Sequence, residues 1–116
     1  MSAEGRVLVC GGRDYADWGT LDSVLDLVNP AVVIHGAARG ADSLAGRWAR
    51  EMHGVTEEAF PADWDKHGKS AGPIRNQRML DDGKPDMVVA FPGGAGTADM
   101  VRRSRAAGIL VLRVEP

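Results

Sequence analysis

The stretch of residues 86–97 reads DMVVAFPGGAGT, and its pattern decides the fold. A short apolar run is followed by a glycine-rich turn, and a helix is expected to begin at Thr97. Such an apolar run is typical of a parallel strand that is buried on both faces. The same succession occurs twice more, as RVLVCGG at residues 6–12 and as AVVIHG at residues 31–36.

The rest of the chain alternates between helices and strands. Helices are expected over residues 21–28, 41–52, 73–82 and 97–107, with Thr20 as the N-cap of the first. Further strands are expected at residues 109–114 and, with polar residues that suit a sheet edge, at 55–60. Residues 61–72 (PADWDKHGKSAG) show no periodicity and are interpreted as a loop, which at that length is typical of a functional segment.

This alternation predicts the fold class. Strands that alternate with helices form a parallel sheet with right-handed crossovers. We expect one α/β domain over residues 1–116, a Rossmann-like three-layer α/β/α structure around a five-stranded, mostly parallel sheet. The strand order 3-2-1-4-5 is expected from the fold class and not from individual residues.

Composition restricts the possible functions. The chain has 116 residues, a net charge of −2 and a single cysteine, Cys10. Duplex nucleic acid is therefore not an expected partner, no intrachain disulfide can form, and a reducing cytoplasm is the expected location. We read no signal peptide in residues 1–6 and find no apolar run long enough to span a bilayer.

The chemistry is expected at the ends of three strands. In open α/β sheets, ligands bind at the carboxyl ends of the strands, where the strand order reverses. Glycine-rich turns stand at three of these ends, and each is followed by a helix whose N-terminal amides can bind an anion. We therefore predict a phosphate site, although a lone glycine turn can equally be a tight connection. Its candidate residues are Gly11, Gly12, Arg13, Asp14, Gly36, Arg39, Gly40, Asp42, Pro92, Gly93, Gly94, Gly96 and Thr97.

Several common sites are absent from the sequence. No Walker A lysine, GxGxxG fingerprint or GxSxG elbow is present, so no cofactor is predicted. The histidines at positions 35, 53 and 67 lack metal-site spacing, and no metal is predicted. His35 faces the rim as the histidine to test first, or is simply a satisfied, half-buried side chain. Cys10 is interpreted as a small buried residue.

Two segments could complete the pocket. In the helix after Pro73, the apolar residues do not form one stripe. This pattern has three interpretations: Arg75 or Arg78 points into the pocket, the helix packs on a second subunit, or the helix is polar and solvated. In the preceding segment, Trp64 could be a lid that stacks on a base, or an anchor for the loop. Lys66, His67 and Lys69 could contact phosphate or form a solvated charge cluster.

Four stretches together resemble the SLOG superfamily, in particular its YspA/YpsA-related branch. They are GGRDY (11–15), HGAARGADSLAGRWA (35–49), FPADWDKHGKSAGPIRNQRM (60–79) and FPGGAGTADMVRRSRAAGI (91–109). The resemblance implies a Rossmann-like fold, glycine-rich loops that bind nucleotides or nucleotide-derived ligands, and a homodimer or higher homo-oligomer.

The resemblance extends to two groups with different activities. In the LOG phosphoribohydrolases, a similar phosphate loop is paired with a glutamate where this chain has Met100, and Arg75 falls where they carry a catalytic arginine. Without that glutamate, hydrolysis would need a carboxylate from Asp14, Asp42 or Asp99. The DprA-type proteins bind DNA, for which Arg102, Arg103 and Arg105 form a basic strip, but the acidic balance of the chain argues against DNA.

We predict a module that senses, carries or sequesters a phosphate-bearing metabolite, most simply a nucleotide derivative. Amides of residues 93–97 would hold phosphate, Arg75 would neutralise it, and Asp42 would accept ribose hydroxyls. The alternative is a hydrolase of the N-glycosidic bond of a nucleotide, with Arg75, Asp42 and Asp99 as candidate catalytic residues.

Overall fold

The computed structural model describes residues 5–52 and 54–116 and contains one five-stranded sheet. The predicted order is confirmed: neighbouring strands follow the order β3-β2-β1-β4-β5, and all four strand pairs are parallel. The strands are β1 (Arg6–Cys10), β2 (Val32–His35), β3 (Thr56–Ala59), β4 (Met87–Ala90) and β5 (Leu110–Arg113).

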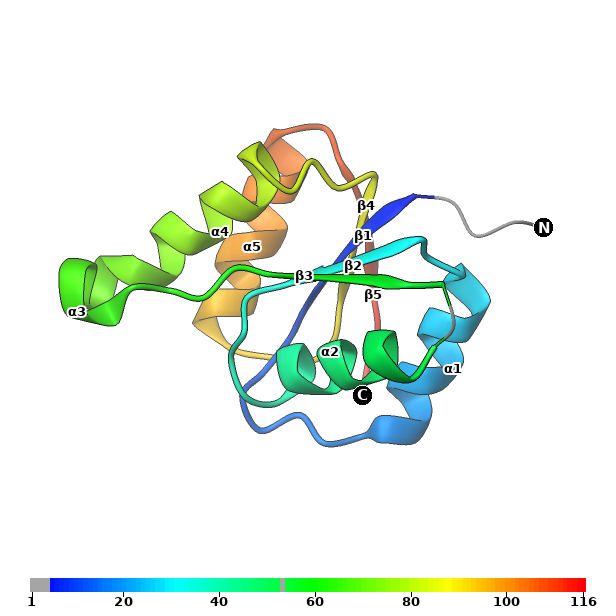
Figure 1. The fold of residues 1–116 in the computed structure, drawn as a ribbon. Coiled ribbons are helices and arrows are strands. Elements are labelled where there is room, and N and C mark those ends of the chain that lie inside the picture. Colours follow the sequence, from blue (N-terminus) through cyan, green and yellow to red (C-terminus); the bar gives the residue numbers. More distant parts are fainter. Residues whose placement is uncertain (1–4, 53) are drawn as a thin grey trace.

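Helices cover both faces of this sheet (Figure 1). One face carries α1 (Trp18–Val28) and α2 (Ala41–Glu51), and the other carries α4 (Ala71–Asp81) and α5 (Ala95–Ala106). The short α3 (Trp64–His67) and a 3₁₀ turn (Gly68–Ser70) precede α4 and project from the body of the molecule. The predicted three-layer α/β/α architecture is therefore confirmed.

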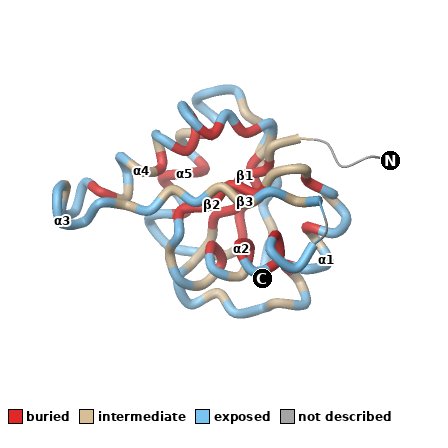
Figure 2. Tube along the Cα trace, viewed as in Figure 1, coloured by how far each residue is buried: buried red, intermediate tan, exposed pale blue. Residues whose placement is uncertain are grey.

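The core consists of two apolar clusters, one on each side of the sheet. Leu25 and Trp48 pack on one face, and Met79 and Met100 pack on the other. Figure 2 shows that the central strands are buried, whereas α3 is exposed. Fully burying one such apolar side chain contributes roughly 1.5–3 kcal/mol, so the two clusters hold the strand ends, and the turns that follow them, in fixed positions.

Three local predictions are wrong. One is the start of α5, which begins at Ala95 and not at Thr97. The other two concern helices that an aspartate caps. Residues 61–72 are not a continuous loop, because the Asp63 carboxylate caps α3 by accepting the Lys66 amide at 3.1 Å. Thr20 is not the N-cap of α1: Asp17 takes that position and accepts both the amide of Thr20, at 3.1 Å, and its hydroxyl, at 2.6 Å. In both places an aspartate starts a helix earlier than the apolar spacing indicates.

The sheet topology decides where a ligand can bind. From β1 the chain adds β2 and β3 on one side of the sheet and then β4 and β5 on the other, so the strand order reverses beside β1. Among the helices of the described residues, none has both the length and the apolar character of a membrane span. The predictions made for residues 1–4 and for His53 lie outside the described residues.

Candidate functional site

A pocket of about 620 Å³ lies beyond the carboxyl ends of β1 and β4, between α4 and the start of α5. This volume is within the usual range of small-molecule sites. The predicted residues that line it include Gly11, Gly12, Arg13, Asp42, Trp64, Lys69, Arg75, Gly94, Gly96, Thr97 and Asp99.

The start of α5 supplies unpaired backbone donors to this pocket. Gly94 is the N-cap and no side chain caps the helix; the Ala98 amide is the first to bond within it, donating to the Gly94 carbonyl at 3.0 Å. The amides of Ala95, Gly96 and Thr97 therefore have no acceptor within the helix. Together with the helix dipole they favour an anion at this position.

The turn after β1 is tied directly to its neighbours. The Gly12 amide donates to the Pro92 carbonyl at 2.9 Å, and the Gly12 carbonyl accepts the Ala41 amide at 3.1 Å. A Cβ at Gly12 would lie 3.0 Å from the Pro92 oxygen, so a larger residue would push the two turns slightly apart. Gly40 and Gly93 pack against this turn and do not line the pocket. Backbone contacts thus bring the three turns together at one rim.

The turn after β2 carries its own anion. Oδ2 of the buried Asp42 accepts the amides of Gly36, at 3.1 Å, and Ala38, at 3.3 Å. Burial raises the pKa of Asp42, although these hydrogen bonds and the nearby Arg75 guanidinium oppose the rise. Within the described structure Oδ1 has no hydrogen-bond partner, so this atom remains able to accept a hydroxyl group from a ligand.

His35 stands behind this turn and outside the pocket. Its Nδ1 accepts the Ala37 amide at 3.0 Å, and its Nε2 lies 2.6 Å from a Glu57 oxygen. Burial raises the pKa of Glu57, but hydrogen bonds from His35 and Arg50 outweigh this effect and lower it. The prediction that His35 faces the rim is wrong, and the alternative of a satisfied histidine is confirmed; the side chain is fully buried.

Arg75 lies across the pocket from α5. Its Nη1 donates to the Gly36 carbonyl and its Nε donates to Asn76 Oδ1 at 3.1 Å, whereas Nη2 has no acceptor in the described structure. Burial lowers the pKa of Arg75, and the carboxylate of Asp42 opposes this while Arg13 adds to it. One edge of a fixed guanidinium is therefore available to a ligand. Arg78, the other candidate, points away and faces Asp82 at 3.8 Å.

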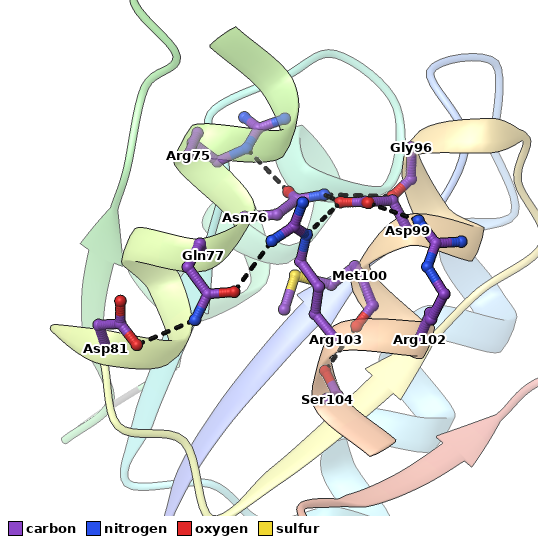
Figure 3. Close-up of polar contacts among 10 residues, drawn as sticks. All are labelled: Arg75, Asn76, Gln77, Asp81, Gly96, Asp99, Met100, Arg102, Arg103 and Ser104. Carbon is purple, nitrogen blue, oxygen red and sulfur yellow. Dashed lines mark hydrogen bonds and ion pairs between the residues drawn. The ribbon is translucent and has the colours of Figure 1, made fainter. Parts of the chain in front are cut away.

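Asp99 lies at the base of the pocket and is fully engaged (Figure 3). It accepts hydrogen bonds from Asn76 and Arg103 at 2.9 Å each and from Arg102 at 2.8 Å. Burial raises the pKa of this carboxylate, but the bonds from Asn76 and Arg103 outweigh burial and lower it. The network connects α4 to α5, and it takes two of the three arginines of the predicted basic strip.

Position 100 provides no polar group to the pocket. Met100, which stands where the similar phosphoribohydrolases carry a glutamate, is fully buried in the apolar cluster beneath α4 and α5. Its neighbour Asp99 lines the pocket, but its oxygens are held by three side chains.

The predicted lid residues separate into two groups. Trp64 is 48% exposed, and the Arg13 guanidinium lies 5.5 Å from its ring centroid. Lys69 also lines the pocket, whereas Lys66 and His67 line neither this pocket nor its neighbour. Trp64 is thus part of the pocket wall.

Two of the remaining candidates, Gly36 and Arg39, line a second hollow of about 520 Å³. Asp14 lies 3.3 Å from Arg39, with both side chains largely exposed. Asp14 and Pro92 line neither hollow.

Sequence reasoning missed several pocket residues, among them Cys10, Asn76 and Met79. Burial raises the pKa of Cys10 to about 12, so its thiol is an inert part of the wall. The position of Cys10 directly before Gly11 could have indicated its place at the rim. Among the residues that the structure describes, no three His, Cys, Asp or Glu side chains come together in a way that could hold a metal ion.

The sequence is similar to that of known proteins. The model of the YspA, cpYpsA-related SLOG family matches residues 5–67, which contain the first two glycine-rich turns. The chain is also similar to a protein of Mycobacterium phage D29, named Gene 61 protein. The two are 42% identical over 118 aligned residues, which cover 92% of this chain and 94% of the phage protein.

Proposed function

The chain belongs to the YspA, cpYpsA-related SLOG family, and from that premise we propose that it binds a nucleotide or a nucleotide-derived small molecule through a phosphate group. The observation that carries this proposal is the uncapped start of α5. Three unpaired amides, at Ala95, Gly96 and Thr97, open into a pocket of small-molecule size opposite the free edge of Arg75.

The other walls suit the remainder of a nucleotide. Oδ1 of Asp42 is an acceptor without a partner among the described residues, which suits a ribose hydroxyl. The exposed ring of Trp64 offers a flat apolar surface on which a base can stack. Arg13, Lys69 and Arg102 add positive charge at the mouth of the pocket.

Binding without hydrolysis is the function that these contacts favour. Cleavage of an N-glycosidic bond develops positive charge on the sugar, which an available carboxylate must stabilise. Asp99 is neutralised by two arginines, and Met100 lies in the core. Asp42 is then the remaining carboxylate in the lining of this pocket, and one of its oxygens already holds two amides.

The test uses two arginines of the same helix. Arg75→Ala removes a pocket side chain, whereas Arg78→Ala removes an exposed one that lines neither hollow. Binding of the four nucleoside 5′-monophosphates to each protein would be measured by titration calorimetry. We expect Arg75→Ala to weaken binding about tenfold or more, because it removes a charge-assisted hydrogen bond, and Arg78→Ala to leave it unchanged.

Two results would contradict the proposal. Equal losses in the two variants would show that general positive charge is responsible and not the pocket. Release of free base during incubation with wild-type protein, abolished by Asp42→Asn, would show that the protein is a hydrolase.

A further inference from the structure

The second hollow adjoins the first. Four residues line both: Arg13, Ala38, Trp64 and Arg75. Arg13 and Trp64, which lie 5.5 Å apart from guanidinium carbon to ring centroid, therefore stand at the boundary between the two hollows. A ligand that starts at α5 and passes this boundary would reach the second hollow.

The lining of the second hollow is more positively charged than that of the first. Its lining contains three arginines, Arg13, Arg39 and Arg75, and no carboxylate. The lining of the first pocket includes both Asp42 and Asp99. The second hollow therefore favours an anionic group over a neutral one.

Side chains and not backbone would hold that group. The amides of Ala37 and Ala38 already donate to His35 and Asp42. Arg39 is only loosely held: its contact with Asp14 measures 3.3 Å, and the two side chains are 73% and 95% exposed. An ion pair this exposed contributes little, so a doubly charged group can displace Asp14 at small cost.

We infer that the ligand of this protein is a nucleotide with a second, separate phosphate group, which Arg13 and Arg39 hold while the first phosphate lies at the start of α5. This inference rests on the proposed function. The flat ring of Trp64 lines both hollows, so the base or sugar of such a ligand can pack on it.

The experiment compares each nucleoside 5′-monophosphate with its 3′,5′-bisphosphate by titration calorimetry. The measured quantity is the ratio of the two dissociation constants in wild type, Arg39→Gln and Asp14→Asn. We expect the wild type to bind the bisphosphate about tenfold tighter. Arg39→Gln should abolish most of this gain, and Asp14→Asn should keep or increase it because Arg39 loses a competitor. Added salt should reduce the gain, since Arg39 is exposed.

The Asp14 variant separates binding from structure. If the Asp14–Arg39 pair merely shapes the loop, both substitutions break it and both lose the gain equally, which would overturn the inference. A bisphosphate that binds no tighter than its monophosphate would also overturn it while leaving the proposed function intact. If none of these nucleotides binds, the proposed function and this inference fall together.

Discussion

Gly94→Asp should stabilise the fold and weaken ligand binding at the same time. Gly94 is the N-cap of α5, with a φ of −101°, which residues other than glycine can adopt. A Cβ at this position would meet no other atom within 4 Å. The carboxylate of the variant can accept the unpaired amide of Gly96 or Thr97, as capping aspartates do. The substitution thus places an anion, covalently attached, where we propose that the ligand phosphate binds.

Gly94→Asp should raise the stability of the fold slightly and lower the affinity for the ligand strongly. An aspartate N-cap gains a few tenths of a kcal/mol over glycine, and a negative charge at a helix N-terminus adds about 0.3–1 kcal/mol. A gain of about 1 kcal/mol raises the melting temperature of a domain of this size by roughly 4 °C. The ligand phosphate must then displace or face a like charge. Two unit charges 4 Å apart at a protein surface repel by about 4 kcal/mol, so affinity should fall at least tenfold.

The assay is thermal unfolding without ligand, followed by calorimetric titration with the nucleotide that wild type binds best. Gly94→Asn is the matched control, because it caps the helix without adding charge and should keep most of the affinity. Unchanged affinity in Gly94→Asp would refute the placement of phosphate at α5. An equal loss in Gly94→Asn would show that bulk, and not charge, is responsible.

Two other predictions concern buried groups. Burial raises the pKa of Asp42, so the folded protein keeps the carboxyl proton of Asp42 to a higher pH than the unfolded chain does. The free energy of unfolding therefore falls as the pH rises above the ordinary pKa of aspartate. Asp42→Asn should remove this fall. The pKa of Asp99 is lowered, so its contribution to the free energy of unfolding is present above the ordinary pKa of aspartate and is lost as the pH falls through the lowered pKa. Asp99→Asn should remove that loss. Urea titrations between about pH 3 and pH 7 would give the free energy of unfolding at each pH, and relative to wild type its slope against pH should change in opposite directions in the two variants. Cys10, with a pKa raised to about 12, should react with a disulfide reagent at about pH 8 only as fast as the protein opens, and a rapid reaction of the native protein would show that the pocket exposes its thiolate.

The three central strands, β1, β2 and β4, were predictable because burial on both faces leaves a continuous apolar run in the sequence. Helix starts were less predictable where one side chain decides them, as Asp17 and Asp63 do. The irregular pattern of α4 has a physical cause that the sequence conceals. Asn76 occupies a core-facing position and is satisfied by Asp99, 23 residues away, so a buried polar residue interrupts the apolar stripe. The homo-oligomer that the family resemblance implies stays a prediction.

The three glycine-rich turns looked equivalent in the sequence, and one residue position separates their roles. In α2 the second helical residue is Asp42, whose carboxylate takes the amides of its own turn. In α5 the corresponding residue is Gly96, which has no side chain to do so. A helix N-terminus with an internal carboxylate is already neutralised, whereas one that begins Gly-Ala-Gly can gain a counter-charge only from outside. The difference between Asp42 and Gly96 therefore supports, from the sequence itself, our proposal that the turn before α5 binds the ligand phosphate and that the turn before α2 shapes the wall beside it.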